Sequence, residues 1–116
     1  MKTISSPRQR DIYWVDFDPS KGSEQAGKRP AVVISGDSLN EHMPIHIVCP
    51  LTTRVMGGTG RVTVSANTTN GLKKDSDVLT MHIRTISPDR FGKKIGHISA
   101  AQLQQIILSL QQVLTY

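Results

Sequence analysis

The sequence predicts a mainly β protein that ends in one amphipathic helix, and three observations support this fold class. Short apolar runs, rich in β-branched residues and bounded by Gly, Pro or Asp, recur from residue 11 to residue 98. The last residues instead repeat their apolar positions every three or four residues. The chain of 116 residues is long enough for one hydrophobic core. We therefore expect a small, partly closed β barrel with a helix laid against it.

The expected strands are short and are separated by turn residues. In chain order they are DIYWVDF (residues 11–17), AVVIS (31–35), IHIVC (45–49), RVTVSA (61–66), DVLTMHIRTI (77–86) and KKIGHI (93–98). RVTVSA alternates, which sets Val62, Val64 and Ala66 on one face of its strand. DVLTMHIRTI is long enough to form a central strand of the sheet.

Helical segments are expected at three places. Asp37 is in position to cap a single turn that Pro44 would stop, and Ser87-Pro88 fits the start of a second turn. The C-terminal segment carries stronger signals, because Ser99 and Gln102 have the spacing of a capping box. Ile98 and Leu103 add the spacing of a hydrophobic staple. The apolar face of this helix is then formed by Leu103, Ile106, Ile107, Leu110, Val113 and Leu114.

The chain is expected to hold one domain, residues 10–116, after a loose N-terminal arm of residues 1–9. The first residues carry no apolar segment of the kind that directs secretion. No run approaches the roughly 20 apolar residues that cross a bilayer. A cytoplasmic protein with no membrane partner is therefore predicted.

The charge of the chain points to an acidic partner. The sequence has 14 Lys and Arg against 9 Asp and Glu, a net charge of +5. Nucleic acid or an acidic protein segment is therefore the leading class of partner. Cys49 is the single cysteine, and the four histidines have no ligand-type spacing, so neither a metal site nor a cofactor is expected.

Three stretches, in this order and spacing, carry a family resemblance. They are RDIYWVDFDPSKGSEQAGKRPAVVIS (residues 10–35), VCPLTT (48–53) and DSDVLTMHIRTISPDRFGKKIGHIS (75–99). Through them, residues 10–114 resemble the MazF/PemK/Kid family of toxin endoribonucleases. The resemblance implies an SH3-like barrel of the CcdB/PemK toxin group, a homodimer, and sequence-selective cleavage of single-stranded RNA without a metal. It also implies a cognate antitoxin with an acidic, disordered segment.

The resemblance places the catalytic arginine at Arg29 and the catalytic threonine at Thr52. In metal-independent cleavage the ribose 2′-hydroxyl attacks the phosphorus, so the enzyme must move protons and hold the developing negative charge. An arginine can grip two phosphate oxygens and stays charged, and a threonine hydroxyl can donate to a third. From the residues alone, Arg29 could instead pair with Glu24 or Asp18, and Thr52 could be an ordinary strand-end threonine.

RNA contacts are expected from the loop before Arg29 and from residues near Thr52. The candidates are Glu24, Gln25, Lys28, Thr53, Arg54, His82 and Arg84. Arg61, Lys73 and Lys74 could extend the same basic groove, although scattered cations are usually only a solvated face. His82 departs from the family, which commonly has glutamine at this position.

The sequence leaves two alternatives to a nuclease open. Toxins such as CcdB share the barrel and poison DNA gyrase without cutting nucleic acid, and fold alone does not separate them from nucleases. The second alternative is a relative of the nucleases that binds RNA without cutting it. The pair Arg29 and Thr52 beside a glycine-rich loop favours the nuclease, because a gyrase poison has no chemical need for it.

Overall fold

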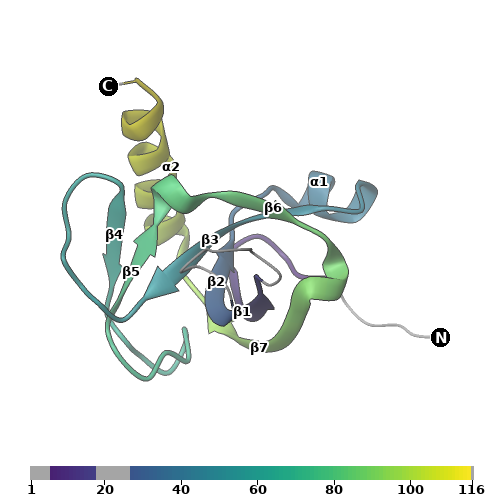
Figure 1. Cartoon of the computed structure of the whole chain (residues 1–116), viewed down its shortest axis with the longest axis horizontal. Coiled ribbons are helices and arrows are strands. Elements are labelled where there is room, and N and C mark those ends of the chain that lie inside the picture. The colour runs from purple at the N-terminus through teal and green to yellow at the C-terminus, as the bar shows by residue number, and fades with distance from the viewer. Residues whose placement is uncertain (1–5, 18–26, 116) are drawn as a thin grey trace.

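The computed structural model describes residues 6–17 and 27–115, and within them seven strands form one antiparallel sheet (Figure 1). The order along the sheet is β4-β5-β3-β2-β1-β7, with β6 also paired to β3. The strands are β1 (Asp11–Asp16), β2 (Lys28–Val33), β3 (His46–Thr52), β4 (Arg61–Val64), β5 (Ser76–Leu79), β6 (Arg84–Ile86) and β7 (Phe91–His97). The helical elements are α1 (Asp37–His42), η1 (Thr80–His82), η2 (Pro88–Arg90) and α2 (Ala100–Thr115).

Strand β3 joins the two parts of the sheet. Its first residues pair with β6 and β2, and its last two, Leu51 and Thr52, pair with Val78 and Asp77 of β5. The end of β3 therefore lies where the β4–β5 hairpin meets the larger part of the sheet. The mainly β fold with a C-terminal helix is confirmed, while the SH3-like barrel stays a prediction.

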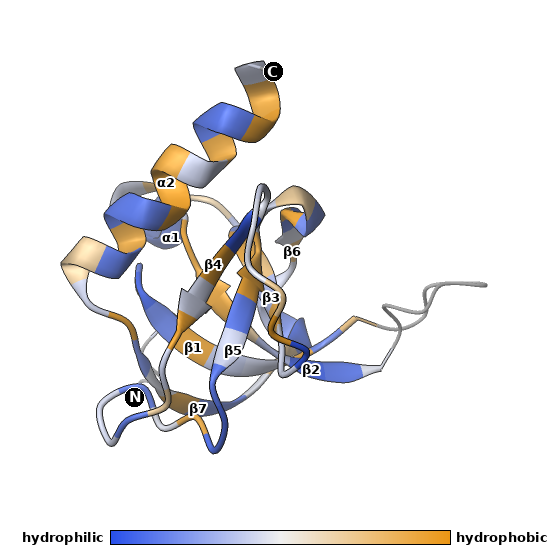
Figure 2. Ribbon diagram, turned by 90° about the vertical axis from the view of Figure 1, so that its left-hand side faces the viewer, coloured by the Kyte–Doolittle hydropathy of each residue, from blue (hydrophilic) through white to orange (hydrophobic). Residues whose placement is uncertain are grey.

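Two hydrophobic clusters use opposite faces of β1, β2 and β3, as the alternation of side chains along a strand requires. Val15, Val33 and Val48 belong to the cluster on one face. Ile12 and Cys49 belong to the cluster on the other, which α2 covers through Ile106. Figure 2 shows α2 lying over the β4 side of the sheet, with hydrophobic and hydrophilic residues interleaved along its turns.

Cys49 lies at the centre of the sheet, in the α2-covered cluster. It has no exposed surface, and burial raises the pKa of its thiol to about 12. The cysteine therefore serves as a small apolar core residue, as its position in an apolar run suggests.

Helix α2 begins as the sequence predicts. The backbone N–H of Ser99 donates to Gln102 Oε1 at 3.0 Å, and the backbone N–H of Gln102 donates to Ser99 Oγ at 3.1 Å. This is a complete capping box. Ile98 is buried and Leu103 packs against the same cluster, in agreement with the predicted staple.

The expected single strand DVLTMHIRTI is wrong, because η1 divides it into β5 and β6. Thr80 lies at the break and bonds to two distant residues. Its hydroxyl meets Ser109 Oγ of α2 at 2.8 Å in the interior, and its backbone N–H donates to Gly60 O at 3.0 Å. The bond to Gly60 continues the β4–β5 register by one residue, and the bond to Ser109 holds Thr80 against α2 where the chain turns into η1.

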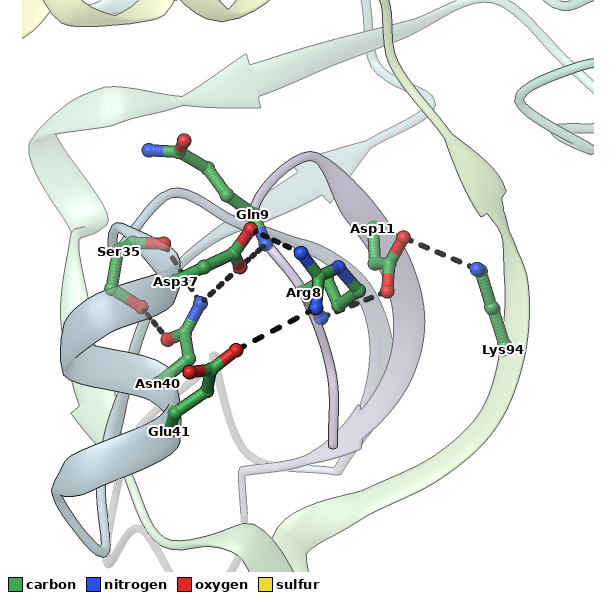
Figure 3. A network of polar contacts seen from close by, with 8 residues as sticks. All are labelled: Arg8, Gln9, Asp11, Ser35, Asp37, Asn40, Glu41 and Lys94. Atoms are coloured by element: carbon green, nitrogen blue, oxygen red, sulfur yellow. Dashed lines mark hydrogen bonds and ion pairs between the residues drawn. The ribbon is translucent and has the colours of Figure 1, made fainter. Parts of the chain in front are cut away.

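The N-terminal segment is anchored where residues 8 and 9 meet α1 (Figure 3). The sequence predicts both residues in a loose arm, yet Gln9 N donates to Asp37 Oδ1 at 2.8 Å and Arg8 Nη2 donates to Asp37 Oδ2 at 3.0 Å. The N-cap of α1 is Gly36, so Asp37 is not the cap that the sequence predicts. The Gln9 hydrogen bond is the main cause of the lowered pKa of Asp37.

Candidate active site

Arg29 and Thr52 lie on the same face of neighbouring strands. In the β2–β3 ladder Val33 faces Val48 and Ala31 faces Pro50, which is the last pair of the ladder. The same register continued by two residues sets Arg29 opposite Thr52. Directly opposed residues of an antiparallel pair project to one side of the sheet. Both side chains are half-buried, so each keeps some surface for a ligand.

The hydroxyl of Thr52 is oriented by the chain that follows it. Arg54 N donates to Thr52 Oγ1 at 3.2 Å, which occupies an acceptor position of the hydroxyl. The hydroxyl proton stays available, because a threonine is at once a donor and an acceptor. Thr52 can therefore donate to an anion.

Asp77, opposite Thr52 in the β3–β5 pairing, holds the loop that follows Thr52. This carboxylate has no exposed surface and accepts four hydrogen bonds. The donors are Met56 N at 2.8 Å, Gly57 N at 2.9 Å, Arg61 Nη1 at 2.9 Å and Thr63 Oγ1 at 2.6 Å. Burial alone would raise the pKa of Asp77, but these bonds outweigh it and hold the pKa well below its usual range. The sequence does not point to Asp77, because its donors lie 14 to 21 residues earlier, in strand β4 and the loop before it.

The two arginines of this loop differ in role. Arg61 binds Asp77 and also donates to the carbonyl oxygen of Arg54 at 3.0 Å, so it stabilises the loop and is not free to line a groove. The Arg54 side chain is exposed. The predicted candidate Arg54 is thus presented to solvent beside Thr52, whereas Arg61 is structural.

Arg84 lies on the same side of β3 as Thr52. It is paired with Val48 in the β3–β6 ladder, and its guanidinium carbon sits 5.0 Å from the centre of the Phe17 ring. This cation–π contact orients a half-buried arginine. Val48 and Thr52 are four residues apart, about 13 Å along the strand, so Arg84 could contact RNA only away from the scissile bond.

Thr53 faces the other side of the sheet. It borders a cleft of about 640 Å³ that also contains Trp14, Pro30, Leu72 and Ile95, with Gly71 and Ser76. Four lysines surround this cleft, which we call the lysine cleft: Lys73, Lys74, Lys93 and Lys94. The sequence drew attention to the first two lysines only. The other two come from β7, and only the fold brings the pairs together.

The remaining predicted RNA-binding residues do not lie together in one place. Lys28 is exposed at the start of β2, and His82 is exposed at the end of η1. Glu24 and Gln25 lie outside the described residues. His46 is buried with its ring edge-on to Phe91 at 5.0 Å, and burial lowers its pKa despite a backbone interaction with Pro7.

Residues 6–17 and 27–115 contain neither a cluster of metal-binding side chains nor a membrane-spanning helix. Within them, no group of three or more His, Cys, Asp or Glu side chains is placed to hold a metal ion. In the same residues, no helix has both the length and the apolar character needed to cross a membrane.

The sequence and the structure of the chain both match one family of toxins. Residues 8–114 match the model of the PemK-like, MazF-like toxins of type II toxin-antitoxin systems. The chain is 35% identical over 104 residues to endoribonuclease MazF9 of Mycobacterium tuberculosis, covering 85% of this chain and 88% of that protein. It is 38% identical over 101 residues to the endoribonuclease toxin MazF of Escherichia coli K12, covering 86% of each. The crystal structure of MazF from Deinococcus radiodurans superposes with a TM-score of 0.82 at 28% identity, over 97% of this chain and 100% of that one.

Proposed function

Because the chain belongs to the PemK-like, MazF-like family of type II toxins, we propose that it is a sequence-selective endoribonuclease that cleaves single-stranded messenger RNA. The observation that carries the proposal is the register that sets Arg29 opposite Thr52. We treat residues 10–116 as the catalytic domain. Messenger RNA as substrate places the activity in the cytoplasm.

The proposed reaction is a transesterification at one phosphate. The ribose O2′ forms a bond to phosphorus as the bond from phosphorus to O5′ breaks. A proton leaves O2′, and a proton is delivered to the departing O5′. The products are a 2′,3′-cyclic phosphate and a 5′-hydroxyl, and no metal takes part.

Arg29 and Thr52 stabilise the charge that develops on the phosphate. The guanidinium of Arg29 grips two phosphate oxygens, and the hydroxyl of Thr52 donates a further hydrogen bond. Asp77 keeps Thr52 at its place by fixing the chain after it. Arg54 and Arg84 contact neighbouring phosphates, and Lys28 and His82 extend the contact surface, together with Glu24 and Gln25.

The toxin acts as a homodimer and is held inactive by a cognate antitoxin. The dimer is supported by apolar side chains near the η1–α2 contact, where Met81 is 56% exposed and Leu108 is 53% exposed. The antitoxin is supported by the family to which the chain belongs. An acidic, disordered antitoxin segment matches the net charge of +5.

The proposal is tested by incubating the purified protein with mixed single-stranded RNA in EDTA and mapping the new ends. We expect a few short recognition sequences with cyclic phosphate and 5′-hydroxyl ends, and no cleavage of duplex RNA. Arg29→Ala and Thr52→Ala should each lower kcat/KM by about 100-fold or more, with the circular dichroism spectrum retained. Thr85→Ala, an exposed threonine of β6, is the matched control. Intact RNA together with inhibited DNA gyrase would favour the gyrase-poison alternative.

A further inference from the structure

The lysine cleft is built by two close backbone contacts. Loop 65–75 lies so near β7 that a Cβ on Gly71 would sit 2.2 Å from Ile95 O, and one on Gly96 would sit 2.5 Å from Asn70 O. Gly71 also has a φ of +68°, which other residues rarely adopt. Glycine at both positions allows the two backbones to meet, and this contact brings Lys73 and Lys74 beside Lys93 and Lys94.

Loop 65–75 is also fixed from within. Asn70 is buried, and its Oδ1 accepts from Asn67 N and Leu72 N, each at 3.0 Å. Its Nδ2 donates to Ser65 O at 2.8 Å. Because these bonds satisfy the amide, the loop presents its two lysines from a preorganised backbone.

The β7 side of the cleft depends on irregular pairing. Tyr13 pairs with Lys94 but Val15 pairs with Phe91, so one extra residue of β7 lies opposite the strand between these pairs. A bulge of this kind redirects side chains, which in a regular strand would alternate between faces. A second shift, between the pairs Ile12–Gly96 and Tyr13–Lys94, leaves Ile95 as another extra residue of β7. Lys93, Lys94 and Ile95 all border the same cleft.

Among the described residues, one of the four lysines of the cleft forms an ion pair. Lys94 pairs with Asp11 at 3.2 Å (Figure 3). Within residues 6–17 and 27–115, no ion pair is formed by Lys73, Lys74 or Lys93. Like charges held together on a preorganised frame repel one another, so an anionic ligand would be stabilised there.

The cleft also borders the proposed active site. Pro30 and Thr53 are the chain neighbours of Arg29 and Thr52, and they turn to the other face of the sheet. Trp14 pairs with Pro30 and is 43% exposed, so its ring offers a flat surface beside the lysines. An aromatic ring next to cations is the combination on which single-stranded nucleic acids stack.

We propose that the lysine cleft binds the RNA strand that flanks the cleaved phosphate, with a base stacked on Trp14 and phosphates held by Lys73, Lys74 and Lys93. The proposal rests on the proposed ribonuclease function. RNA fits better than an acidic peptide, because the cleft begins one residue from each member of the catalytic pair. A strand held at that pair can continue past Pro30 and Thr53 into the cleft.

Trp14 is the only tryptophan of the chain, so its fluorescence reports on the surroundings of one ring, which borders this cleft and also a second pocket that contains Lys28 and Arg90. The lysine variants therefore decide whether the bound RNA lies in the cleft. The probe is a mixed-sequence 2′-O-methyl RNA of about 12 nucleotides, which cannot be cut because its nucleophile is capped. We expect quenching on titration, with a logarithmic salt slope that becomes about 1.4 smaller in Lys73→Gln/Lys93→Gln, or about 0.7 per lysine. Arg8→Gln is the control, because that charge already faces Asp37 and Glu41, and its slope should not change.

Three outcomes would overturn the proposal. The first is unchanged Trp14 emission when RNA is bound, and the second is an unchanged salt slope in the double variant. The third is quenching by polyglutamate but not by RNA, which would assign the cleft to an acidic protein segment.

A kinetic measurement separates this proposal from the proposed function. Two RNAs containing one mapped cleavage site are compared, a short one that ends near the site and a long one that extends beyond it on both sides. We expect the ratio of kcat/KM for long over short RNA to fall by roughly 10-fold in the double variant and to stay constant in Arg8→Gln. If wild type cuts neither RNA, the nuclease proposal fails while the fluorescence titration still tests the cleft. If wild type cuts both equally well, only the cleft proposal fails.

Discussion

Asp77 and Asn70 are both buried polar side chains that organise a loop, yet they do so in different ways. Asp77 accepts four hydrogen bonds, two of them from the distant side chains of Arg61 and Thr63. Asn70 bonds only to backbone groups within five residues. The first holds the loop beside the proposed catalytic threonine, and the second holds the loop of the lysine cleft. A charged centre therefore joins distant segments and responds to pH, whereas a neutral amide fixes a local turn and does not respond to pH.

Removal of the Asp77 carboxylate should have the largest effect on the stability of the fold. Asp77→Ala leaves Arg61 without its carboxylate and leaves two backbone N–H groups without acceptors. We expect a loss of about 3–5 kcal/mol in the free energy of unfolding, measured by urea denaturation. Asp75→Ala, an exposed neighbour whose carboxylate accepts from Ala66 N, should lose about 1 kcal/mol or less. Equal losses in the two variants would contradict the central role of Asp77.

The pH dependence of stability distinguishes the two centres directly. The pKa of Asp77 is lower in the folded protein than in the unfolded chain, where it is about 3.9. Its contribution is therefore complete above about pH 4 and is lost as the pH falls toward the folded value. Urea denaturation from pH 6 down to pH 2 should show a shallower decline for Asp77→Asn than for wild type. The stability of Asn70→Ala should decline with pH in the same way as that of wild type. A different decline would contradict the view that Asn70 contributes no pH dependence.

Removal of the neutral centre should have a smaller effect. Asn70→Ala deletes one donor and one acceptor that together satisfy three backbone groups of the loop. We expect a loss of about 2–3 kcal/mol in the free energy of unfolding. Thr68→Ala, an exposed position in the same loop, should change it by less than about 0.5 kcal/mol. An Asn70→Ala protein as stable as wild type would show that Gly71 and Gly96 fix the loop without the amide.

The smallest loss of stability is expected when one of the four hydrogen-bond donors to Asp77 is removed. Thr63→Val removes the hydroxyl that lies 2.6 Å from Asp77 Oδ1 and leaves three other donors in place. A loss of about 1 kcal/mol should follow in the same denaturation experiment. Thr85→Ala serves as the control for removing an exposed strand threonine. A loss as large as that of Asp77→Ala would mean that the four bonds form only as a unit.

Local signals in the sequence predicted local structure well. The capping box at Ser99 and Gln102 depends on residues three apart, so its pattern is complete in the sequence. The strand alternation of Val62 and Val64 was equally visible, and both are buried. The pairing of Arg29 with Thr52 was supplied by family resemblance, and the β2–β3 register supports it.

Features that depend on distant contacts were missed or wrong. The break occurs at Thr80, whose hydroxyl bonds to Ser109 of α2, and no local pattern connects these two residues. Asp77 is expected only as the first residue of a strand, and its role as an acceptor is not visible because its donors lie 14 to 21 residues earlier. The lysine cleft joins two lysine pairs from separate segments, so neither pair indicates the cleft by itself.

Because Cys49 is buried, the reactivity of its thiol reports on opening of the hydrophobic core. A thiol with no exposed surface and a pKa raised to about 12 is neither reachable nor ionised at neutral pH. Alkylation by iodoacetamide therefore has to wait until the sheet separates from α2. The labelling rate of the native chain would report the free energy of that separation without any introduced probe, and it would fall when a bound molecule stabilises the folded state.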